Sequence, residues 1–420
     1  MDKILKVKIN KKTCIDVLFV IVAVLYSGSA YAATDNTIYI YLKYLLAGII
    51  LFLFIIKKKW KIPIKNESSI LPYWIILIWL MIVFFNYLVH MTLLDNLGGM
   101  LSLFFNFVIV YYIVCTISWK NFSNIYVKTI FAISVISLIF YFFVKDFTII
   151  RNLLPIIGDG NNPTKYQGFL FYFFSNDNRN FGAFWEPGIF ATHIILATLL
   201  LPYLKNGNKK IYIIVFTFAL LSTSSSAGYA IFLIVILIWI QIKANDLNIS
   251  KNIKFIFTFL VLMIGFSLYF FSEDLIYFFG LENNDIFAKL LDAENSQRAL
   301  SVIYNWKLFL DSPVIGHGIS GLQNSSYYLM ADEMNIVIDT STTFRHMATY
   351  GIFGLFYTIM FIYGILTNSY ILKNCKILYV LVILLILNKE GQDAFLISWC
   401  ILMYINFIPF KRHSELRRFA

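Results

Sequence analysis

The sequence is built from long apolar segments separated by short basic ones. A helix that crosses the hydrocarbon core of a bilayer needs about 20 predominantly apolar residues. Segments of this kind, two of them short, occur at 14–33, 38–56, 70–90, 98–118, 125–144, 187–204, 211–225, 227–243, 254–272, 350–372, 375–388 and 394–410. The pattern predicts an all-α polytopic membrane protein with about 12 transmembrane helices, folded as a single integral membrane domain over residues 1–420.

Composition agrees with this prediction and excludes other classes. The chain is 60% hydrophobic and only 14% charged, whereas soluble domains carry about 25% charged residues. The net charge of +11 resides in short loops, and no basic helix or aromatic platform for single strands occurs, so we expect no nucleic-acid partner. The four cysteines are widely separated and form no Cys-x-x-Cys, which predicts neither a disulfide framework nor a metal site.

The basic residues also predict the topology. If the N-terminal MDKILKVKINKK is placed inside, most of the 34 Lys and Arg residues fall in inside segments, and the positive-inside rule then puts both termini in the cytoplasm. One alternative concerns the start of the chain. Residues 15–33 follow a basic segment and end in Ala30-Tyr31-Ala32, which resembles a signal-peptidase site. Cleavage there would not alter the remaining topology.

Two outer loops, 145–186 and 273–349, are much longer than the other connections. Long loops in compact proteins are commonly functional, so we expect these two, with short surface helices, to form the active-site face. In the second loop Leu300, Ile303 and Leu310 recur at helical spacing before Asp311-Ser312-Pro313. This predicts a short amphipathic helix on the membrane surface, followed by the glycine-rich turn VIGHGISG.

The stretch RNFGAFWEPG, residues 179–188, leads directly into a predicted span. Pro187 suits the first turn of a helix, Glu186 suits its positive end, and Trp185 suits a membrane interface. Arg179 needs an anionic partner, which is either a carboxylate such as Glu186 or Asp177, or the phosphate of a ligand. The residues alone leave these two alternatives open.

The second loop adds further cations. Arg298 opens the amphipathic helix, and Arg345-His346 precede the predicted span at 350–372. Converging arginines beside a bilayer suit a lipid pyrophosphate leaving group. His346 suits a general base or, equally, a solvated interfacial histidine. His317 is expected to bind substrate or to serve only as a turn residue.

Other polar residues have plainer interpretations. Glu390, in the outer turn NKEGQD, is a second candidate carboxylate for the site. His193 is expected to be a packed polar residue, and LSTSSSAG a closely packed hairpin of small residues. No H-x-x-E-H, Walker or Rossmann pattern and no metal-ligand spacing occurs. We therefore expect neither a metal nor a cofactor.

These motifs resemble those of the bacterial O-antigen polymerase (Wzy-type) and O-antigen ligase superfamily. RNFGAFWEP is similar to the family's Arg…Gly…Glu-Pro segment before a central span, and LSTSSSAGY to its Ser/Thr-rich hairpin. Arg298 through Gly318 resembles its Arg…Pro…Gly-x-Gly pattern, followed by YGIFG at 350–354. The resemblance covers residues 179–354, and the rest of the chain matches in span number.

The resemblance implies a metal-independent membrane glycosyltransferase, with a fold similar to that of the GT-C class, in the bacterial inner membrane. It implies undecaprenyl-pyrophosphate-linked oligosaccharides as substrates, membrane lipids as surroundings, and a flippase and a chain-length regulator as partners. Arg179 and Arg298 match the family's pyrophosphate-handling arginines. As candidate catalytic residues we take Arg179, Arg298, Glu186, His346 and Glu390, and as substrate-binding residues Arg345, Trp185 and His317.

One departure separates polymerase from ligase. Ligases carry His-Asn about ten residues before a Gly-x-x-Gly, where this chain has Asp339-Thr340-Ser341-Thr342. We therefore expect an O-antigen polymerase, with an O-antigen ligase as the alternative. A polysaccharide flippase or other transporter is a further alternative, although transporters bury charges near the midplane and are often built from repeats. Here the charged residues lie mainly in loops.

Overall fold

The computed structural model describes residues 11–30, 37–56, 71–144, 153–157, 166–168, 171–174, 179–205, 207–246, 297–323, 341–368, 371 and 373–407. The chain folds into two compact units that alternate along the sequence. Unit 1 comprises residues 1–64, 102–222 and 395–401, and unit 2 comprises residues 65–101, 223–394 and 402–420. Each unit is described by itself.

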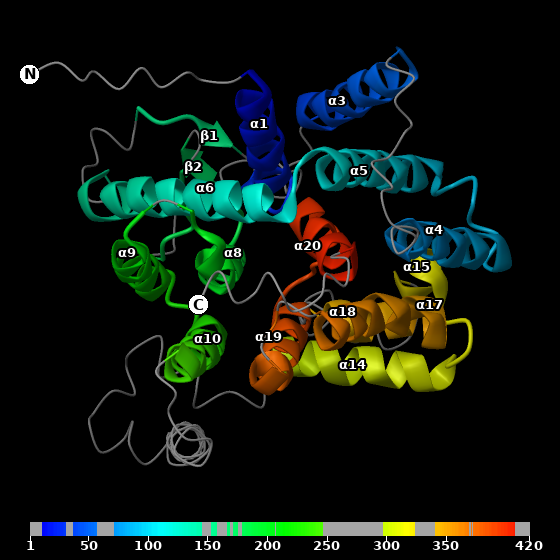
Figure 1. The fold of residues 1–420 in the computed structure, drawn as a ribbon. Coiled ribbons are helices and arrows are strands. Elements are labelled where there is room, and N and C mark those ends of the chain that lie inside the picture. The colour runs from blue at the N-terminus through cyan, green and yellow to red at the C-terminus, as the bar shows by residue number, and fades with distance from the viewer. Residues whose placement is uncertain are drawn as a thin grey trace, which may run out of the picture. The chain divides into compact units, whose positions relative to one another are not determined.

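Unit 1 is mainly helical. Its elements are α1 (Lys11–Leu25), α3 (Thr37–Ile56), most of α5 (Leu97–Thr116), α6 (Trp119–Ile139) with the π-helix η2 (Phe140–Val144), α8 (Pro187–Leu200) with the 3₁₀ turn η3 (Leu201–Tyr203), α9 (Lys209–Ser222), and the start of α20 (Leu396–Phe407). Helices α8, α9 and α1 all contact α6 (Figure 1). Every residue of α8 is buried, so this helix forms the centre of the unit.

Unit 1 also contains the only strands among the described residues. Strands β1 (Ile156–Ile157), β2 (Tyr166–Gly168) and β3 (Tyr172–Phe174) form a three-stranded antiparallel sheet in the order β1-β2-β3. They lie in the loop 145–186, and the short surface helices expected for this loop lie outside its described residues. Segments rich in aromatic residues, such as YQGFLFYFF, suit a pleated strand.

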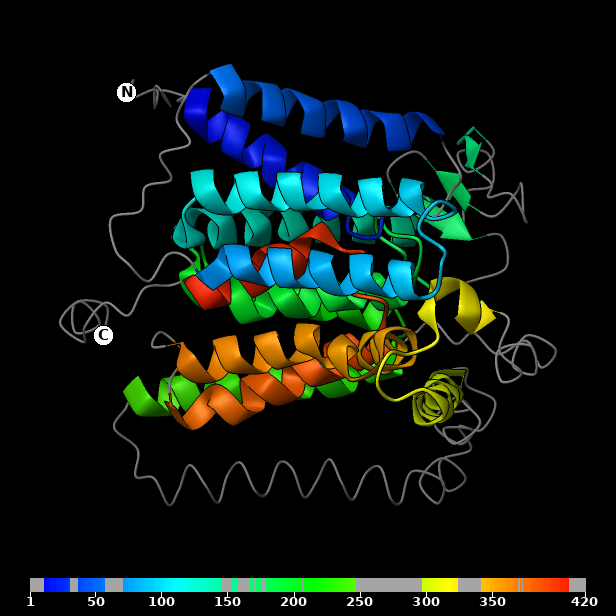
Figure 2. The same ribbon diagram turned by 90° about the vertical axis from the view of Figure 1, so that its right-hand side faces the viewer.

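The described residues of unit 2 form helices joined by turns. Its elements are α4 (Leu71–Val89), the start of α5, α10 (Ser226–Asp246), α14 (Gln297–Asp311), α15 (Gly318–Gln323), α17 (Thr342–Tyr350), η5 (Gly351–Gly354), α18 (Leu355–Thr367), η6 (Lys373–Cys375), α19 (Lys376–Lys389), and the end of α20. Helix α14 contacts α17, and Figure 2 shows α14 nearly end-on while α18 runs across the view. Helix α14 therefore lies across the end of the α17–α18 segment.

The helices agree with a membrane location. Three described segments are long and apolar enough to cross a bilayer, namely Leu97–Thr116, Trp119–Val144 and Thr342–Thr367, and six shorter apolar helices accompany them. Helices α3 and α4 expose rows of large apolar side chains, which soluble proteins avoid over wide areas and which lipid accommodates. Lys43, inside α3, donates a hydrogen bond to Ser102 Oγ at 2.7 Å, which supplies the partner that a cation needs there.

Most predicted spans coincide with helices, with one shift that affects the site. The expected span at 254–272 lies outside the described residues. The expected span at 350–372 is wrong at its start, because the helical segment begins at Thr342. Arg345 and His346 therefore lie inside this segment rather than before it.

Candidate functional site

The start of α17 is fixed by a side-chain cap. Ser341 Oγ accepts a hydrogen bond from the backbone N–H of Phe344, the usual role of a serine at this position. The same hydroxyl donates to Asn388 Oδ1 at 2.8 Å. These two bonds tie the start of α17 to the end of α19. His346 consequently lies in the second turn of a helix whose end is anchored.

Thr342 attaches the turn between α19 and α20 to the same helix. Its Oγ1 donates to the backbone carbonyl of Glu390 at 2.9 Å and accepts from the backbone N–H of Gln392 at 2.7 Å. The Tyr357 hydroxyl donates to the Gln392 carbonyl at 3.4 Å. A single threonine thus fixes the path of the turn, and this path brings Asp393 to His346.

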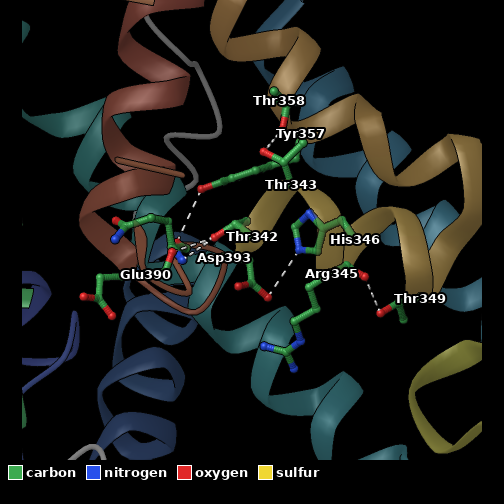
Figure 3. Close-up of polar contacts among 10 residues, drawn as sticks. Thr342, Thr343, Arg345, His346, Thr349, Tyr357, Thr358, Glu390 and Asp393 are labelled. Carbon is green, nitrogen blue, oxygen red and sulfur yellow. Dashed lines mark hydrogen bonds and ion pairs between the residues drawn. The ribbon is translucent and has the colours of Figure 1, made fainter. Parts of the chain in front are cut away.

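His346 and Asp393 form a close charged contact (Figure 3). The distance between His346 Nε2 and Asp393 Oδ2 is 3.4 Å, which is the separation of an ion pair rather than of a short hydrogen bond. The His346 side chain is 2% exposed, whereas that of Asp393 is 26% exposed. The imidazole is therefore buried and the Asp393 side chain is partly exposed, although its Oδ1 is itself a buried atom.

Aromatic rings surround the imidazole. The His346 ring centroid lies 4.7 Å from that of Trp79, 5.7 Å from that of Tyr350 and 5.5 Å from that of Tyr357. The imidazole Nδ1 is buried and has no hydrogen-bond partner among the described residues. An unpaired buried polar atom costs about 1–3 kcal/mol, so this position carries a cost that packing alone does not require. The alternative of a solvated interfacial histidine was wrong.

Asp393 is held in its charged form. Burial raises the pKa of Asp393, but the hydrogen-bonding contact and charge of His346, together with the charge of Arg345, outweigh burial and hold this pKa well below its usual range. Figure 3 shows the Arg345 guanidinium on the same side of α17 as the carboxylate. Arg345 is half-buried. The three side chains form an anion flanked by two basic groups.

Glu390, the carboxylate predicted for this turn, does not face His346 as Asp393 does. It is 5% exposed, its backbone carbonyl accepts the Thr342 bond, and its carboxylate points away from His346 (Figure 3). The turn therefore brings Asp393, and not Glu390, to the imidazole. A catalytic role for Glu390 stays a prediction.

His317 belongs to a backbone junction. Its Nε2 lies 2.9 Å from the carbonyl of Leu308 and, facing a carbonyl, must carry the proton. Its backbone N–H donates to the Ala348 carbonyl at 2.9 Å. These bonds hold the turn after α14 against α17, which is the turn role considered for this residue. Substrate binding by His317 stays a prediction.

Two glycines allow the close backbone contact at this junction between the turn after α14 and the end of α17. Gly316 and Gly351 both have positive φ, and a Cβ at Gly316 would lie 2.3 Å from the Thr349 carbonyl oxygen. A Cβ at Gly351 would lie 2.3 Å from the Val314 carbonyl oxygen. Any side chain would force these two backbones apart. Part of the sequence pattern therefore encodes close backbone packing beside the site.

The amphipathic helix is confirmed as α14, which ends at Asp311 as predicted. Its packed face carries Ser301, Asn305 and Leu308, all fully buried, whereas Ile303 is 46% and Leu310 57% exposed. The predicted apolar stripe thus faces outward, as suits a helix at a membrane surface. Arg298 is the second residue of this helix, and the position of its side chain lies outside the described residues.

The other predicted residues lie in unit 1. Pro187 occupies the first turn of α8 and Glu186 its N-cap, exposed and without a side-chain capping bond. Trp185 is half-buried against Phe395, with ring centroids 5.7 Å apart. Arg179 is half-buried. Since Arg179 belongs to unit 1 and Arg298 and Arg345 to unit 2, the convergence of these arginines stays a prediction.

Asn180 holds the segment around Arg179 in place. Its amide Nδ2 donates to Ser222 Oγ at 2.9 Å, and its backbone N–H donates to the Ser222 carbonyl, also at 2.9 Å. Its Oδ1 accepts from the backbone N–H of Gly182 at 2.9 Å. The first serine of the Ser/Thr-rich hairpin therefore anchors the loop that carries Arg179.

Sequence reasoning missed Asp393 as a site residue. The turn NKEGQD offers two carboxylates, and composition gives no reason to prefer either. The distinguishing signal is the hydroxyl of Thr342, which fixes the turn. In the part of the chain that the structure describes, no group of three or more His, Cys, Asp or Glu residues could hold a metal ion.

Comparison with known families bears on this stretch of the chain. Residues 211–359 match the sequence model of a family described as O-Antigen ligase. The matched range includes Arg298, Arg345 and His346, whereas Arg179 and Asp393 lie outside it. A comparison with curated proteins gives no significant match. Over residues 211–359 the chain is thus similar to the O-antigen ligase and polymerase superfamily, whose members are membrane glycosyltransferase-like enzymes of surface-polysaccharide synthesis.

Proposed function

We propose that the protein is an O-antigen polymerase, which transfers a growing glycan from undecaprenyl pyrophosphate onto a lipid-linked repeat unit. The observation that carries the proposal is the cluster of Arg345, His346 and Asp393, which lies in and beside the stretch similar to the O-antigen ligase family. Glycosyl transfer needs a cation for the departing phosphate and an acceptor for the hydroxyl proton. This cluster contains both.

In this scheme the three arginines have different roles. Arg179 and Arg298 bind the donor pyrophosphate, because the planar guanidinium matches phosphate oxygens in geometry, and they stabilise the charge that develops as it leaves. Arg345 lies beside the proton acceptor and serves the acceptor sugar or the phosphate. Trp185 and the aromatic segment 166–174 hold the isoprenoid or stack on sugar rings. No nucleotide sugar, metal or cofactor takes part.

The setting follows from the same proposal. The protein spans the bacterial inner membrane about 12 times, with both termini cytoplasmic and a fold similar to GT-C enzymes. The site faces the outer side of that membrane, where a flippase delivers the lipid-linked units and a chain-length regulator limits the product. A transporter is the less favoured alternative, because the charged cluster lies in the first turns of the Thr342–Thr367 segment and in the turn between α19 and α20, rather than along the middle of a span.

An O-antigen ligase is the second candidate, and the description of the matched family favours it. The sequence Asp339-Thr340-Ser341-Thr342, which stands where ligases carry His-Asn, weighs against it. The Ser341 and Thr342 hydroxyls instead hold α17 and its neighbouring turn. A ligase would move the finished glycan onto the lipid A core instead of onto another repeat unit. The two candidates share the donor and differ in the acceptor.

A gel of surface glycolipids from a strain that lacks the gene separates these candidates. Loss of the long ladder, with lipid A core capped by a single repeat unit, supports the polymerase. Uncapped core, with polymer still on the lipid carrier, identifies a ligase. Repeat units trapped on the cytoplasmic leaflet identify a transporter and overturn the proposed site.

Substitution of the two donor arginines tests the site. We expect Arg179→Ala and Arg298→Ala each to lower activity by at least about 100-fold, the effect typical of losing a group that stabilises charge in the transition state. Polymer formation from purified lipid-linked units measures this, at matched protein levels. Lys307→Ala is the control, because Lys307 is an exposed cation on the same helix as Arg298. Near-normal activity in both arginine variants would reduce these residues to ordinary ion-pair partners.

A further inference from the structure

We propose that Asp393 is the catalytic carboxylate that meets the acceptor hydroxyl, and that His346 is a positioning residue behind it. The inference rests on the proposed function and replaces His346, Glu186 and Glu390 as the proton acceptor. It concerns the cluster formed by the second turn of α17 and the turn between α19 and α20 (Figure 3).

Exposure separates the two members of the pair. A group that takes a proton from a substrate must come within hydrogen-bond distance of it. The Asp393 side chain is 26% exposed and that of His346 is 2% exposed. Trp79, Tyr350 and Tyr357 pack around the imidazole. A sugar hydroxyl can therefore approach the Asp393 side chain, whose Oδ1 is buried and whose Oδ2 faces His346, without displacing this aromatic packing, whereas the imidazole offers no exposed side.

The charges around Asp393 favour the same assignment. From α17 it is faced by Arg345, His346 and the buried hydroxyl of Tyr350. In its own turn, the Glu390 carboxylate points away (Figure 3). His346 and Arg345 hold the pKa of Asp393 well below its usual range despite burial. The carboxylate is thus ionised, and ready to accept a hydrogen bond, throughout the physiological range.

A carboxylate of low pKa suits this reaction. Glycosyl transfer passes through an oxocarbenium-like transition state, so the acceptor hydroxyl becomes strongly acidic only as its bond to the sugar forms. In the proposed step the acceptor oxygen bonds to the anomeric carbon, and the bond from that carbon to the pyrophosphate oxygen breaks. The pyrophosphate leaves with the bonding electrons. The hydroxyl proton passes to Asp393 and then to water.

The first test substitutes the carboxylate. We expect Asp393→Asn to lower polymer formation by about 10²- to 10⁴-fold, the range typical of a lost general base, and Asp393→Glu to retain part of the activity. Asp95→Asn is the matched control, because Asp95 is an exposed carboxylate in another turn of the same unit. Activity of Asp393→Asn within about threefold of wild type, at equal protein levels, would overturn the inference.

The second test separates positioning from a merely structural role. In His346→Gln the carboxylate loses its imidazole partner while burial continues to raise its pKa, so activity should disappear at a higher pH on the acid side, by about one to three units. A structural role alone predicts an equal loss at every pH. An unchanged acid limit in His346→Gln would therefore overturn the assignment of His346.

The two proposals fail in different ways. If deletion of the gene leaves the glycolipid ladder unchanged, the proposed function is wrong, and the inference about Asp393 falls with it. If Arg179→Ala and Arg298→Ala lose activity while Asp393→Asn keeps it, the function stands and the inference about Asp393 is overturned. Loss of activity in all three variants, with Asp95→Asn unaffected, supports both.

Discussion

Among the described residues each unit buries one histidine, and the two differ in their hydrogen bonds. In unit 1, His193 Nε2 donates to the Ser27 carbonyl at 2.8 Å, so its Nδ1 accepts from the Tyr126 hydroxyl, also at 2.8 Å. In unit 2, His346 Nδ1 has no partner among the described residues, and Nε2 faces a carboxylate at 3.4 Å. Both side chains are at most 2% exposed.

This difference separates a structural histidine from a functional one. His193 links α8 to the Ser27 turn and to α6, and Phe184 stacks on its ring with centroids 4.4 Å apart. Its polar atoms are satisfied, as folding requires of buried groups. His346 leaves one atom unsatisfied and places the other against a charge. Such a cost is common where an arrangement serves chemistry rather than stability.

The largest effect is expected on the stability of unit 1. His193→Leu removes the ring, so the buried Ser27 carbonyl and the buried Tyr126 hydroxyl each lose their 2.8 Å bond to it, at about 1–3 kcal/mol each. We expect a strongly lowered melting temperature in detergent and little protein in the membrane. Thermal unfolding followed by size-exclusion chromatography measures this. Wild-type stability in His193→Leu would contradict the structural assignment.

The reverse pattern is expected for unit 2. His346→Leu removes a buried unpaired nitrogen but also the partner of Asp393, so the two effects offset each other and stability should change by no more than about 1 kcal/mol. Activity should fall at least about tenfold, because Asp393 loses the imidazole that positions it. Melting temperature and polymer formation are measured on the same preparation. A variant that is unstable yet active per folded molecule would reverse the comparison.

A smaller effect sharpens the account of His193. Tyr126→Phe removes only the hydroxyl that donates to His193 Nδ1, so we expect a loss of about 1–2 kcal/mol of stability. Activity per folded molecule should be unchanged. Tyr212→Phe is the control, because Tyr212 also stacks within unit 1, on Phe131, with ring centroids 4.1 Å apart. Equal melting temperatures for Tyr126→Phe and wild type would show that this bond contributes nothing.

The smallest effect concerns pH. The pKa of Asp393 is depressed in the folded protein, so its contribution to stability is complete above the usual carboxyl range, near pH 4, and is lost as the pH falls below that. The difference in melting temperature between wild type and Asp393→Asn should be constant above about pH 5 and should shrink below about pH 4. A difference that grows on acidification would contradict the direction of the shift.

Much of the helical framework could be predicted from apolar segments, because a bilayer dictates the length and composition of each span. The start of the α17–α18 segment could not. TTFRHMATY is too polar to extend the apolar segment that begins at Tyr350, and its helix depends on the Ser341 cap and on packing against α14. The sheet in the loop 145–186 was missed because two- and three-residue strands leave little periodicity to detect.

The candidate site could be predicted only in part from the sequence, for a similar reason. Arg345 and His346 could be selected because they stand beside a span in an otherwise apolar sequence. Their partner Asp393 is distant in sequence, and the hydroxyl of Thr342 brings it near through bonds to the turn at Glu390 and Gln392. A contact of this kind depends on tertiary structure, which local pattern does not encode.

The most direct measurement is a surface-glycolipid gel from a deletion strain that carries Asp393→Asn at wild-type protein levels. The account predicts lipid A core capped by a single repeat unit, with no ladder, while Asp95→Asn in the same strain restores the full ladder. A full ladder in the Asp393→Asn strain would contradict the central claim that the Arg345–His346–Asp393 cluster is where the acceptor reacts.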